Sequence, residues 1–410
     1  MAFPVKNFYS GMHDAPVING TPGSLINALK ACLITGFGEL TARAASVDNG
    51  YLKLEFADGK TFRKDTVVEI AGATPDSLNG EHWVEVSQEG ACYIKTQETS
   101  ITGTIKVKYA PVGQWTVPYQ ATNKAVFKSV HPHASECLFQ IDDTYAQKAK
   151  VVMYRAMTGI DQGEDYVPFN KQQDTEIIKS ATANTQARLW YLFSDGKTVY
   201  FTISPTTDSV HFSIATCAPF FFHGFGSYIT EGFATKLNAF IQAGKLGNLS
   251  SLWGNRAGTF IIDPASVVSS ANYFHTYIAY HPVTNRRGGK IWHIPERFGN
   301  FQARSGFGYS NSLKEGFNKP NNKIYLSDVI MITDDTHDII GRYPGFLWVN
   351  TDLRKEASTI VNSVIDGADN YDGRRLFAIS SNHDLPVSTT ILGNTNNRSV
   401  AFIDITGPWG

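Results

Sequence analysis

Hydrophobic positions along this chain follow two patterns, one helical stripe near the start and then a long series of alternating runs. The stripe is a set of apolar residues at helical spacing: Leu25, Ile26, Leu29, Cys32 and Leu33. We expect Thr21 to cap this helix, because its hydroxyl can accept a hydrogen bond from the first turn, and Pro22 suits that turn. Gly36 can end the helix. Residues 1–20 precede it and are predicted to form an extended arm.

Beyond the helix, short apolar runs are separated by turn sequences. Asn49 with Gly50, and Asp58 or Asp195 followed by glycine, can adopt the positive φ angles that tight hairpins require. Strands are predicted over residues 51–56, 60–68, 66–70, 83–86, 92–95, 101–109, 125–129, 138–141, 151–157, 188–193, 199–204, 210–215, 259–262, 273–280, 323–332, 376–379 and 400–405. The fold class is therefore expected to be mainly β, with β-sandwich-like or β-barrel-like domains, one N-terminal helix and few other short helices.

One segment, residues 228–247, departs from this alternation. Phe233, Leu237, Phe240 and Ile241 fit the face of a helix, although glycines interrupt the segment. We predict a short helix or lid here.

The length of 410 residues exceeds what a single hydrophobic core usually serves, so several domains are expected. The pattern divides the chain into an arm plus helix over residues 1–36, a small β-domain over 37–112, a β-sandwich-like domain over 113–225 and a C-terminal mainly β domain over 226–410. Pro111 and Gly113 mark the second boundary. Long loops in the last part, such as residues 285–289 and 393–398, are expected to be functional or to contact something.

Composition favours a chain that shares surface with other proteins. Charged residues make up 18% of the sequence, below the roughly 25% of ordinary globular chains, and aromatic residues reach 12%. With 36 basic and 37 acidic side chains, the formal net charge is -1. Such a chain has no long-range field to attract a polyanion, so nucleic acid is not an expected partner.

The cysteines and the apolar runs indicate a soluble chain folded in a reducing compartment. Cys32, Cys92, Cys137 and Cys217 form no CxxC pair and lie in apolar runs, so buried free thiols are expected. Residues 1–11 hold no apolar block of signal-peptide length. Nor is there a run of about eighteen apolar residues, so no membrane span is predicted.

Catalytic and phosphate-binding motifs are incomplete in this sequence. The run from Gly308 through Ser310 begins like a nucleophile elbow but has Ser312 in place of the second glycine. The glycines at 224 and 226 lack the third glycine of a dinucleotide loop. Arg286 and Arg287 form a basic spot too small for nucleic acid. We therefore predict no enzyme activity and no cofactor.

Two groups of polar residues resemble metal ligands in type but not in number or spacing. Asp334, Asp335, His337 and Asp338 could supply oxygen ligands to a divalent cation, but a solvated turn is the preferred interpretation. His131 and His133 lack a third ligand at a fixed spacing, so surface or interface histidines are expected. No metal site is predicted.

Sugar binding or cleavage would need aromatic platforms or two carboxylates across a cleft. The tryptophans that could stack on sugars are Trp190, Trp253, Trp292, Trp348 and Trp409. Most aromatic residues at strand positions are core or interface residues, so a sugar role is the minority expectation for each.

Two stretches at the ends of the chain carry a resemblance to a known family. The first runs from Gly11 to Gly20 and leads into Leu25 and Ile26, and the second runs from Phe402 to Trp409. Together with residues 68–74, 78–80, 122–124 and 373–375, they resemble tailed-bacteriophage virion structural proteins of the tail-associated kind. The resemblance covers most of the chain and is weakest over residues 226–255.

The resemblance implies a structural subunit of a phage virion, in the tail, baseplate or neck, acting through protein–protein interfaces during virion assembly. Its partners would be other copies of itself in an oligomer and neighbouring tail or neck proteins, and its location the virion, assembled in the host cytoplasm. We hypothesise that the arm reaches onto an adjacent subunit, because it is too short to pack by itself. The interface residues predicted for it are Phe3, Phe8, Met12, Pro16, Val17 and Ile18. The competing interpretation is that the arm lies along its own β-domain.

The sequence is compatible with two other functions. The chain could be a receptor-binding or carbohydrate-binding module at the tail tip, with a host-surface glycan as partner, if Trp253, Trp292 and Trp348 cluster at the surface. It could instead be a cell-wall-degrading enzyme, if paired carboxylates or a metal near Asp334 line a cleft.

Overall fold

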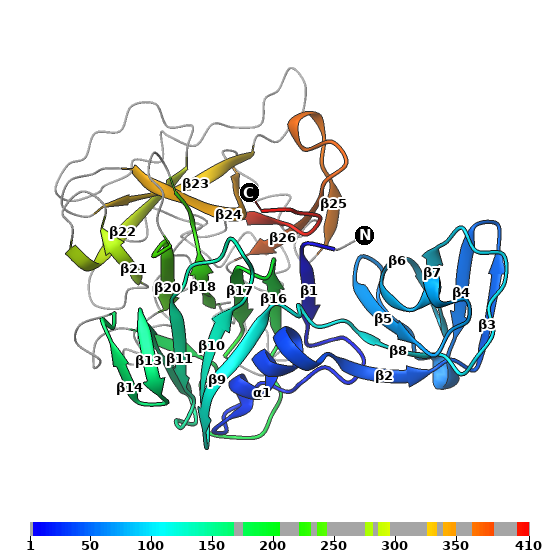
Figure 1. Ribbon diagram of the computed structural model, residues 1–410, viewed down its shortest axis with the longest axis horizontal. Coiled ribbons are helices and arrows are strands. Elements are labelled where there is room, and N and C mark those ends of the chain that lie inside the picture. The colour runs from blue at the N-terminus through cyan, green and yellow to red at the C-terminus, as the bar shows by residue number, and fades with distance from the viewer. Residues whose placement is uncertain are drawn as a thin grey trace, which may run out of the picture.

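Strands make up most of this computed structural model, and they form antiparallel sheets (Figure 1). The structure describes residues 3–167, 175–205, 221–230, 236–243, 275–281, 286–295, 326–333, 339–349, 363–380 and 400–409. Across these ranges there are sheets of thirteen, seven, five and two strands. The predicted mainly β fold class is confirmed.

The predicted helix begins at Ser24 and ends at Thr35, with Gly36 as the residue that follows it. It consists of α1 (Ser24–Lys30) followed by the π-helical turn η1 (Ala31–Thr35). Its stripe is buried as expected, with Leu25, Ile26, Leu29, Cys32 and Leu33 all at most 4% exposed. Gly36 ends the helix with a φ of 73°, which a residue with a side chain rarely adopts.

Seven strands between residues 37 and 109 form a small closed barrel, drawn at the right of Figure 1. They are β2 (Phe37–Thr41), β3 (Ala44–Asp48), β4 (Tyr51–Glu55), β5 (Val67–Ala71), β6 (Gly80–Gln88), β7 (Ala91–Lys95) and β8 (Lys106–Tyr109), with short turns η2 (Ala57–Gly59) and η3 (Asp76–Leu78). The edge strands β2 and β3 are joined by Ala42 and Arg43, whose amides donate to Ile105 O at 2.9 Å and Glu55 O at 2.7 Å. The stretch formed by β2 and β3 therefore hydrogen-bonds to β8 at one end of the strand order and to β4 at the other, which closes the barrel.

The next sheet has five strands in the order β15-β12-β11-β10-β9. Its members are β9 (Trp115–Ala121), β10 (Lys124–Ser129), β11 (Leu138–Asp142), β12 (Lys148–Tyr154) and β15 (Glu176–Ile178). A separate hairpin of β13 (Ala156–Gly159) and β14 (Gln162–Glu164) follows β12.

The thirteen-stranded sheet, called the main sheet here, joins the two ends of the chain. Its order is β1-β16-β17-β18-β20-β21-β22-β23-β24-β27-β26-β25, with β19 paired to β24. The strands are β1 (Lys6–Tyr9), β16 (Trp190–Ser194), β17 (Thr198–Ile203), β18 (Phe221–Ser227), β19 (Ile229–Thr230), β20 (Ala239–Ala243), β21 (His275–His281), β22 (Arg286–Pro295), β23 (Leu326–Thr333), β24 (Ile339–Val349), β25 (Val364–Asp366), β26 (Arg375–Ser380) and β27 (Val400–Asp404), and the turn η6 (Asp369–Tyr371) lies between the last elements. Because β19 follows β18 directly, its pairing with β24 means that the sheet curls back on itself. The main sheet also runs across residue 225, where a domain boundary was predicted.

The five-stranded sheet packs on one face of the main sheet, as in a β-sandwich. Phe139 and Trp115 meet Phe225 of β18, with ring centroids 5.1 and 5.5 Å apart. The other face of β16, β17 and β20 is also covered, by a second apolar cluster that includes Phe193, Tyr200 and Phe240. Strands covered on both faces are apolar at successive positions and do not alternate.

Several predictions of local structure are wrong in the described residues, among them the first half of the predicted strand 101–109, since β8 begins only at Lys106. Phe240 and Ile241 lie in strand β20 and not in a helix, because they point to opposite faces of a sheet that is buried on both sides. The run 60–66 is not a strand, and β5 begins only at Val67. The remaining positions of the predicted lid, 231–235 and 244–247, lie outside the described residues.

Candidate functional site: the docked N-terminal arm

The N-terminal arm is described over residues 3–20. Its first part contains β1, an edge strand of the main sheet. β1 pairs antiparallel with β16, with Lys6 opposite Ser194 and Tyr9 opposite Tyr191. The Tyr9 and Tyr191 rings stack with their centroids 5.8 Å apart. Phe8 lies in the main apolar core and is 2% exposed. The arm therefore contributes both backbone pairing and a core side chain to its own chain.

The second part of the arm continues along the residues that precede β16. The Trp190 indole Nε1 donates to Pro16 O at 3.1 Å, and the Arg188 amide donates to Ile18 O at 2.8 Å. Gly20 donates through its amide to Asn184 O at 2.9 Å. A Cβ at Gly20 would lie 1.9 Å from Thr182 O, so only glycine fits at this position.

Arg188 organises the loop against which Gly20 packs. Its side chain is 2% exposed, and the guanidinium donates to Ser180 Oγ at 2.7 Å, Thr182 Oγ1 at 3.0 Å and Asn184 Oδ1 at 2.8 Å. Alternate residues of the loop thus turn their oxygens toward one buried cation. This wrapping fixes the loop that receives the arm.

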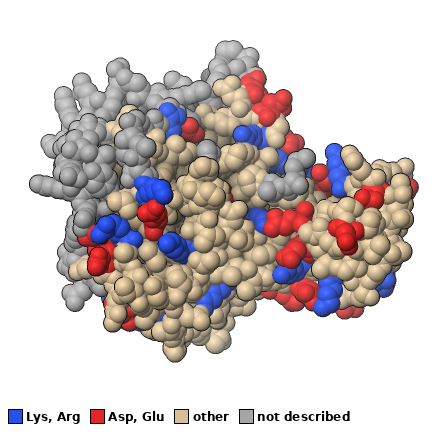
Figure 2. All heavy atoms as spheres, viewed as in Figure 1, with Lys and Arg blue, Asp and Glu red and all other residues tan. Residues whose placement is uncertain are grey.

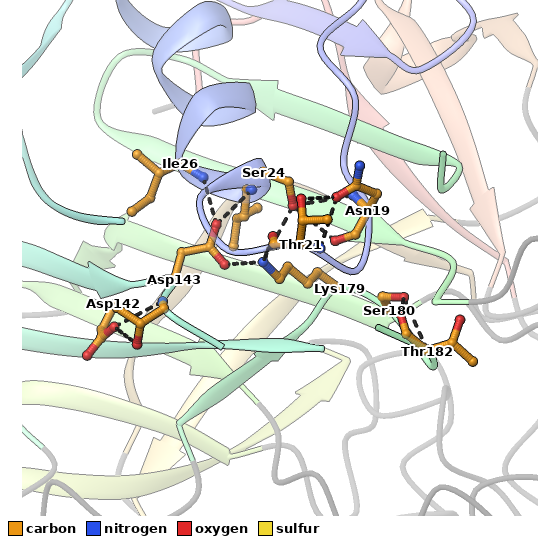
Figure 3. Close-up of polar contacts among 11 residues, drawn as sticks. Asn19, Thr21, Ser24, Ile26, Asp142, Asp143, Lys179, Ser180 and Thr182 are labelled. Carbon is orange, nitrogen blue, oxygen red and sulfur yellow. Dashed lines mark hydrogen bonds and ion pairs between the residues drawn. The ribbon is translucent and has the colours of Figure 1, made fainter. Parts of the chain in front are cut away.

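The arm passes into α1 over a buried ion pair (Figure 3). Asp143, which follows β11, accepts hydrogen bonds from the amides of Leu25 at 2.9 Å and Ile26 at 3.3 Å. The Lys179 ammonium contacts the same carboxylate and donates to Thr21 O at 2.5 Å. Both charged side chains are 0% exposed. The pair therefore joins the arm, the helix and the five-stranded sheet.

Burial dominates the electrostatics of this pair. Removal of the Asp143 carboxylate from water raises its pKa to about 6, although the Lys179 charge and the two helix amides act in the opposite direction. The same burial lowers the pKa of Lys179, while the charge of Asp143 opposes the shift. Negative charge at the N-terminus of a helix is otherwise favourable.

The predicted cap residue is wrong. The residue before α1 is Gly23, which has no side chain to offer, and the Thr21 hydroxyl instead donates to Asn19 Oδ1 at 2.6 Å. The acceptor for the helix amides comes from Asp143, more than one hundred residues away along the chain. No local pattern in the sequence contains this signal.

The C-terminal segment lies beside the start of the arm. Trp409 is 2% exposed, and its Nε1 donates to Asp404 O at 2.6 Å. Arg374 pairs with the Asp404 carboxylate at 3.1 Å and also donates to Gly407 O. A Cβ at Gly407 would lie 2.5 Å from Val5 Cγ2, so the two ends of the described chain are in contact.

The six predicted interface residues occupy different environments in the single chain. Phe8, Met12 and Ile18 are buried in its own core. Phe3 and Pro16 are half-buried, and the Phe3 ring lies 6.1 Å from that of Trp83 in the barrel. Val17 is 51% exposed. The interface role of these residues stays a prediction, and Val17 is the member that a neighbour can reach without moving the arm.

The other candidate groups are not brought together in the described part of the chain. His131 and His133 have ring centroids 5.7 Å apart, and among the described residues no group of three metal-ligating side chains is found. Gly224 and Gly226 lie within strand β18. Cys32, Cys92 and Cys137 are buried free thiols, as predicted. Ser310, Cys217 and Asp334 to Asp338 lie outside the described residues.

The tryptophans divide in the same way. Trp190 and Trp409 are core residues, at 1% and 2% exposure, so neither presents a surface to a sugar. Trp253 lies outside the described residues, as do the side chains of Trp292 and Trp348. In the described ranges, no helix has the length and apolar character needed to cross a membrane.

Charge is dispersed over the face of the molecule shown in Figure 2. Basic and acidic side chains are interspersed there, and uncharged residues cover most of the area between them. This agrees with the charged fraction of 18% and the formal net charge of -1. The visible face thus offers no single-sign field to a highly charged partner.

No protein-family model and no curated protein matches this chain.

Proposed function

We propose that this protein is a structural subunit of the virion of a tailed bacteriophage, located in the tail, baseplate or neck. In this proposal it acts through interfaces with other copies of itself and with neighbouring tail or neck proteins, and it is incorporated into particles assembled in the host cytoplasm. It carries out no chemical step and needs no cofactor.

One observation carries the proposal. Two stretches on which the family resemblance rests, residues 11–20 beside the segment that precedes β16 and residues 402–409 at the end of β27, are fastened by buried contacts. Met12, Ile18 and Trp409 are at most 4% exposed, and Pro16 O and Asp404 O accept hydrogen bonds from buried indoles. Buried contacts of this kind hold the chain in a fixed shape, which is what a building block of a particle requires.

The surface chemistry supports the same function. A subunit must stay soluble until it meets its neighbours, and interface surfaces are depleted in charge and rich in aromatic and apolar groups. Val17 and Leu189 are 51% and 37% exposed, and the hydrogen bond from the Arg188 amide to Ile18 O places their backbones side by side. They form an accessible apolar pair, one residue on the arm and one on the segment that precedes β16.

The test is to locate the chain in purified particles of the phage that encodes it. Peptide mass spectrometry should find the protein at a fixed ratio to other tail or neck components, and electron cryomicroscopy should place it at a symmetric position. Absence of the chain from infectious particles would overturn the proposal. So would release of glycan or peptide fragments from bacterial cell walls by the purified chain, since a structural subunit has no turnover.

A further inference from the structure

The arm contacts the small barrel as well as the main sheet. Along β1, the Lys6 ammonium contacts the Glu81 carboxylate and Pro111 O, and the Asn7 side chain donates to Asp65 O at 2.7 Å. The Phe3 ring faces Trp83, and the Phe8 ring lies 5.8 Å from that of Phe37. These four arm side chains, Phe3, Lys6, Asn7 and Phe8, are called the strap below.

The strap is buried between the two bodies that it joins. Lys6 is 3% exposed and Asn7 is 7% exposed, and burial lowers the pKa of Lys6. A buried ammonium and a buried amide need partners of fixed geometry. The strap therefore specifies one position of the barrel relative to the main sheet.

The covalent links to the barrel are close together. The chain enters through Gly36 and leaves after Tyr109, and a Cβ at Gly36 would lie 2.5 Å from Tyr109 O. Beyond the exit, the amides of Val112 and Gly113 donate to Cys32 O and Leu33 O, both at 2.9 Å, so the exit is fixed to η1. Two adjacent links act as a hinge. The hinge by itself does not restrain rotation of the barrel about these links.

Direct contacts between the barrel and the rest of the main sheet supplement the strap. Arg375 of β26 pairs with Asp65 at 3.0 Å, and Trp83 packs against the second apolar cluster. Asp65 and Trp83 are also the barrel residues that Asn7 and Phe3 contact. The arm and β26 therefore meet the barrel at neighbouring atoms of the same residue, Asp65.

We propose that the N-terminal arm is a conformational strap: while it is docked it holds the barrel in one orientation, and its displacement frees the barrel to rotate about residues 36 and 109–111. The proposed function supplies a trigger for displacement of the arm, because a neighbouring subunit that binds the arm would release the barrel during assembly. The device itself is a property of the single chain and is tested on it.

The experiment measures the barrel's position in solution. Nitroxide labels are attached after Lys95→Cys on the barrel and Gln120→Cys on the five-stranded sheet, in a Cys217→Ser background, and the distance distribution is recorded by pulsed electron paramagnetic resonance. Both labelled positions are exposed, whereas Cys32, Cys92 and Cys137 are buried. With the strap intact, one narrow distribution is expected.

The strap variant Phe3→Ala/Lys6→Met/Asn7→Ala removes contacts to the barrel and keeps the β1 backbone and Phe8. We expect its distance distribution to become at least about twofold broader and the small-angle X-ray scattering curve to show a larger maximum dimension. The matched control Ser10→Ala/Val17→Ala changes arm residues outside the strap, since Ser10 Oγ accepts from the Trp190 amide and Val17 is 51% exposed, and it should keep the narrow distribution. Lys6→Met alone should broaden it partly, which keeps the test usable if the triple variant does not fold.

An unchanged narrow distribution in a folded strap variant would overturn the inference. Equal broadening in the strap variant and the control would also overturn it, because the effect would then belong to general loosening of the arm. Neither result bears on whether the chain is part of a virion, and absence from virions would leave the measured coupling intact.

Discussion

Asp143 supplies to helix α1 the side-chain hydrogen-bond acceptor that a cap residue of the helix itself ordinarily supplies. The first amides of a helix have no partner inside it, and here two of them donate to a carboxylate from another element. Because Lys179 lies on the other side of that carboxylate, the charge at the helix end is compensated within a site with no exposure to water. A buried pair of this kind is costly to form but far more costly to break on one side only.

We therefore expect Asp143→Asn and Lys179→Met each to lower the free energy of unfolding by about 3–5 kcal/mol, because either change leaves one buried charge without its partner. The double variant should lose clearly less than the sum of the two single losses. Urea unfolding of the four proteins near neutral pH gives this comparison. Losses that simply add would show that the two groups do not interact.

The same variants give a pH dependence with a definite sign. Since the pKa of Asp143 is raised to about 6 in the folded chain, the folded state holds its proton more tightly than the unfolded state. Stability from this group is therefore present below about pH 4 and is lost as the pH rises toward about 6. The difference in unfolding free energy between wild type and the double variant should fall across that window.

At the scale of elements, the contact between β24 and the C-terminal segment depends on one glycine. Gly345 has a φ of +65°, and a Cβ there would lie 2.2 Å from Cδ1 and Nε1 of Trp409. Trp409 is buried and cannot move aside without losing its hydrogen bond to Asp404 O. Gly373 has a similar φ of +75° but no atom within 4 Å of its Cβ position.

These two glycines separate backbone strain from steric overlap. Gly373→Ala should lower the free energy of unfolding by about 1 kcal/mol, from the positive φ alone. Gly345→Ala carries the same strain and adds overpacking, so a loss of about 2–4 kcal/mol is expected. Urea unfolding measures both, and equal losses would contradict the role assigned to Trp409.

Elements whose signals are local could be predicted from the sequence. Asn49 and Gly50 both have positive φ at the β3–β4 turn. The buried apolar stripe of the helix that precedes Gly36 could be predicted from helical spacing alone. Strand β20 could not be predicted, because successive apolar residues fit both a helix and a strand buried on two faces. The acceptor role of Asp143 and the fit of Gly345 against Trp409 depend on residues distant in sequence.

At the scale of the whole molecule, one continuous apolar cluster includes residues of the arm, helix α1, the barrel and both large sheets. Because Phe8, Met12 and Ile18 of the arm belong to this cluster together with the barrel, the packing of the barrel depends on the arm. The composition predicted surface shared with other proteins. No spacing of residues in the sequence could show that the arm packs on its own chain. Long-range pairing of β1 with β16 decides this.

Val17, in the exposed part of the arm, can be reached by a neighbour while the arm stays docked. Replacing Val17, which is 51% exposed, by aspartate should change the free energy of unfolding by less than about 0.5 kcal/mol. It should weaken self-association by at least about tenfold, because a charge would have to be buried beside Leu189 in the interface. Val130→Asp is the matched control, since Val130 is 57% exposed and lies outside the arm. Light-scattering mass measured over a concentration series should show wild type and the control associating alike and the Val17 variant requiring higher concentration. A wild-type chain that stays monomeric throughout, or two variants that weaken association equally, would remove the arm from the contact between copies.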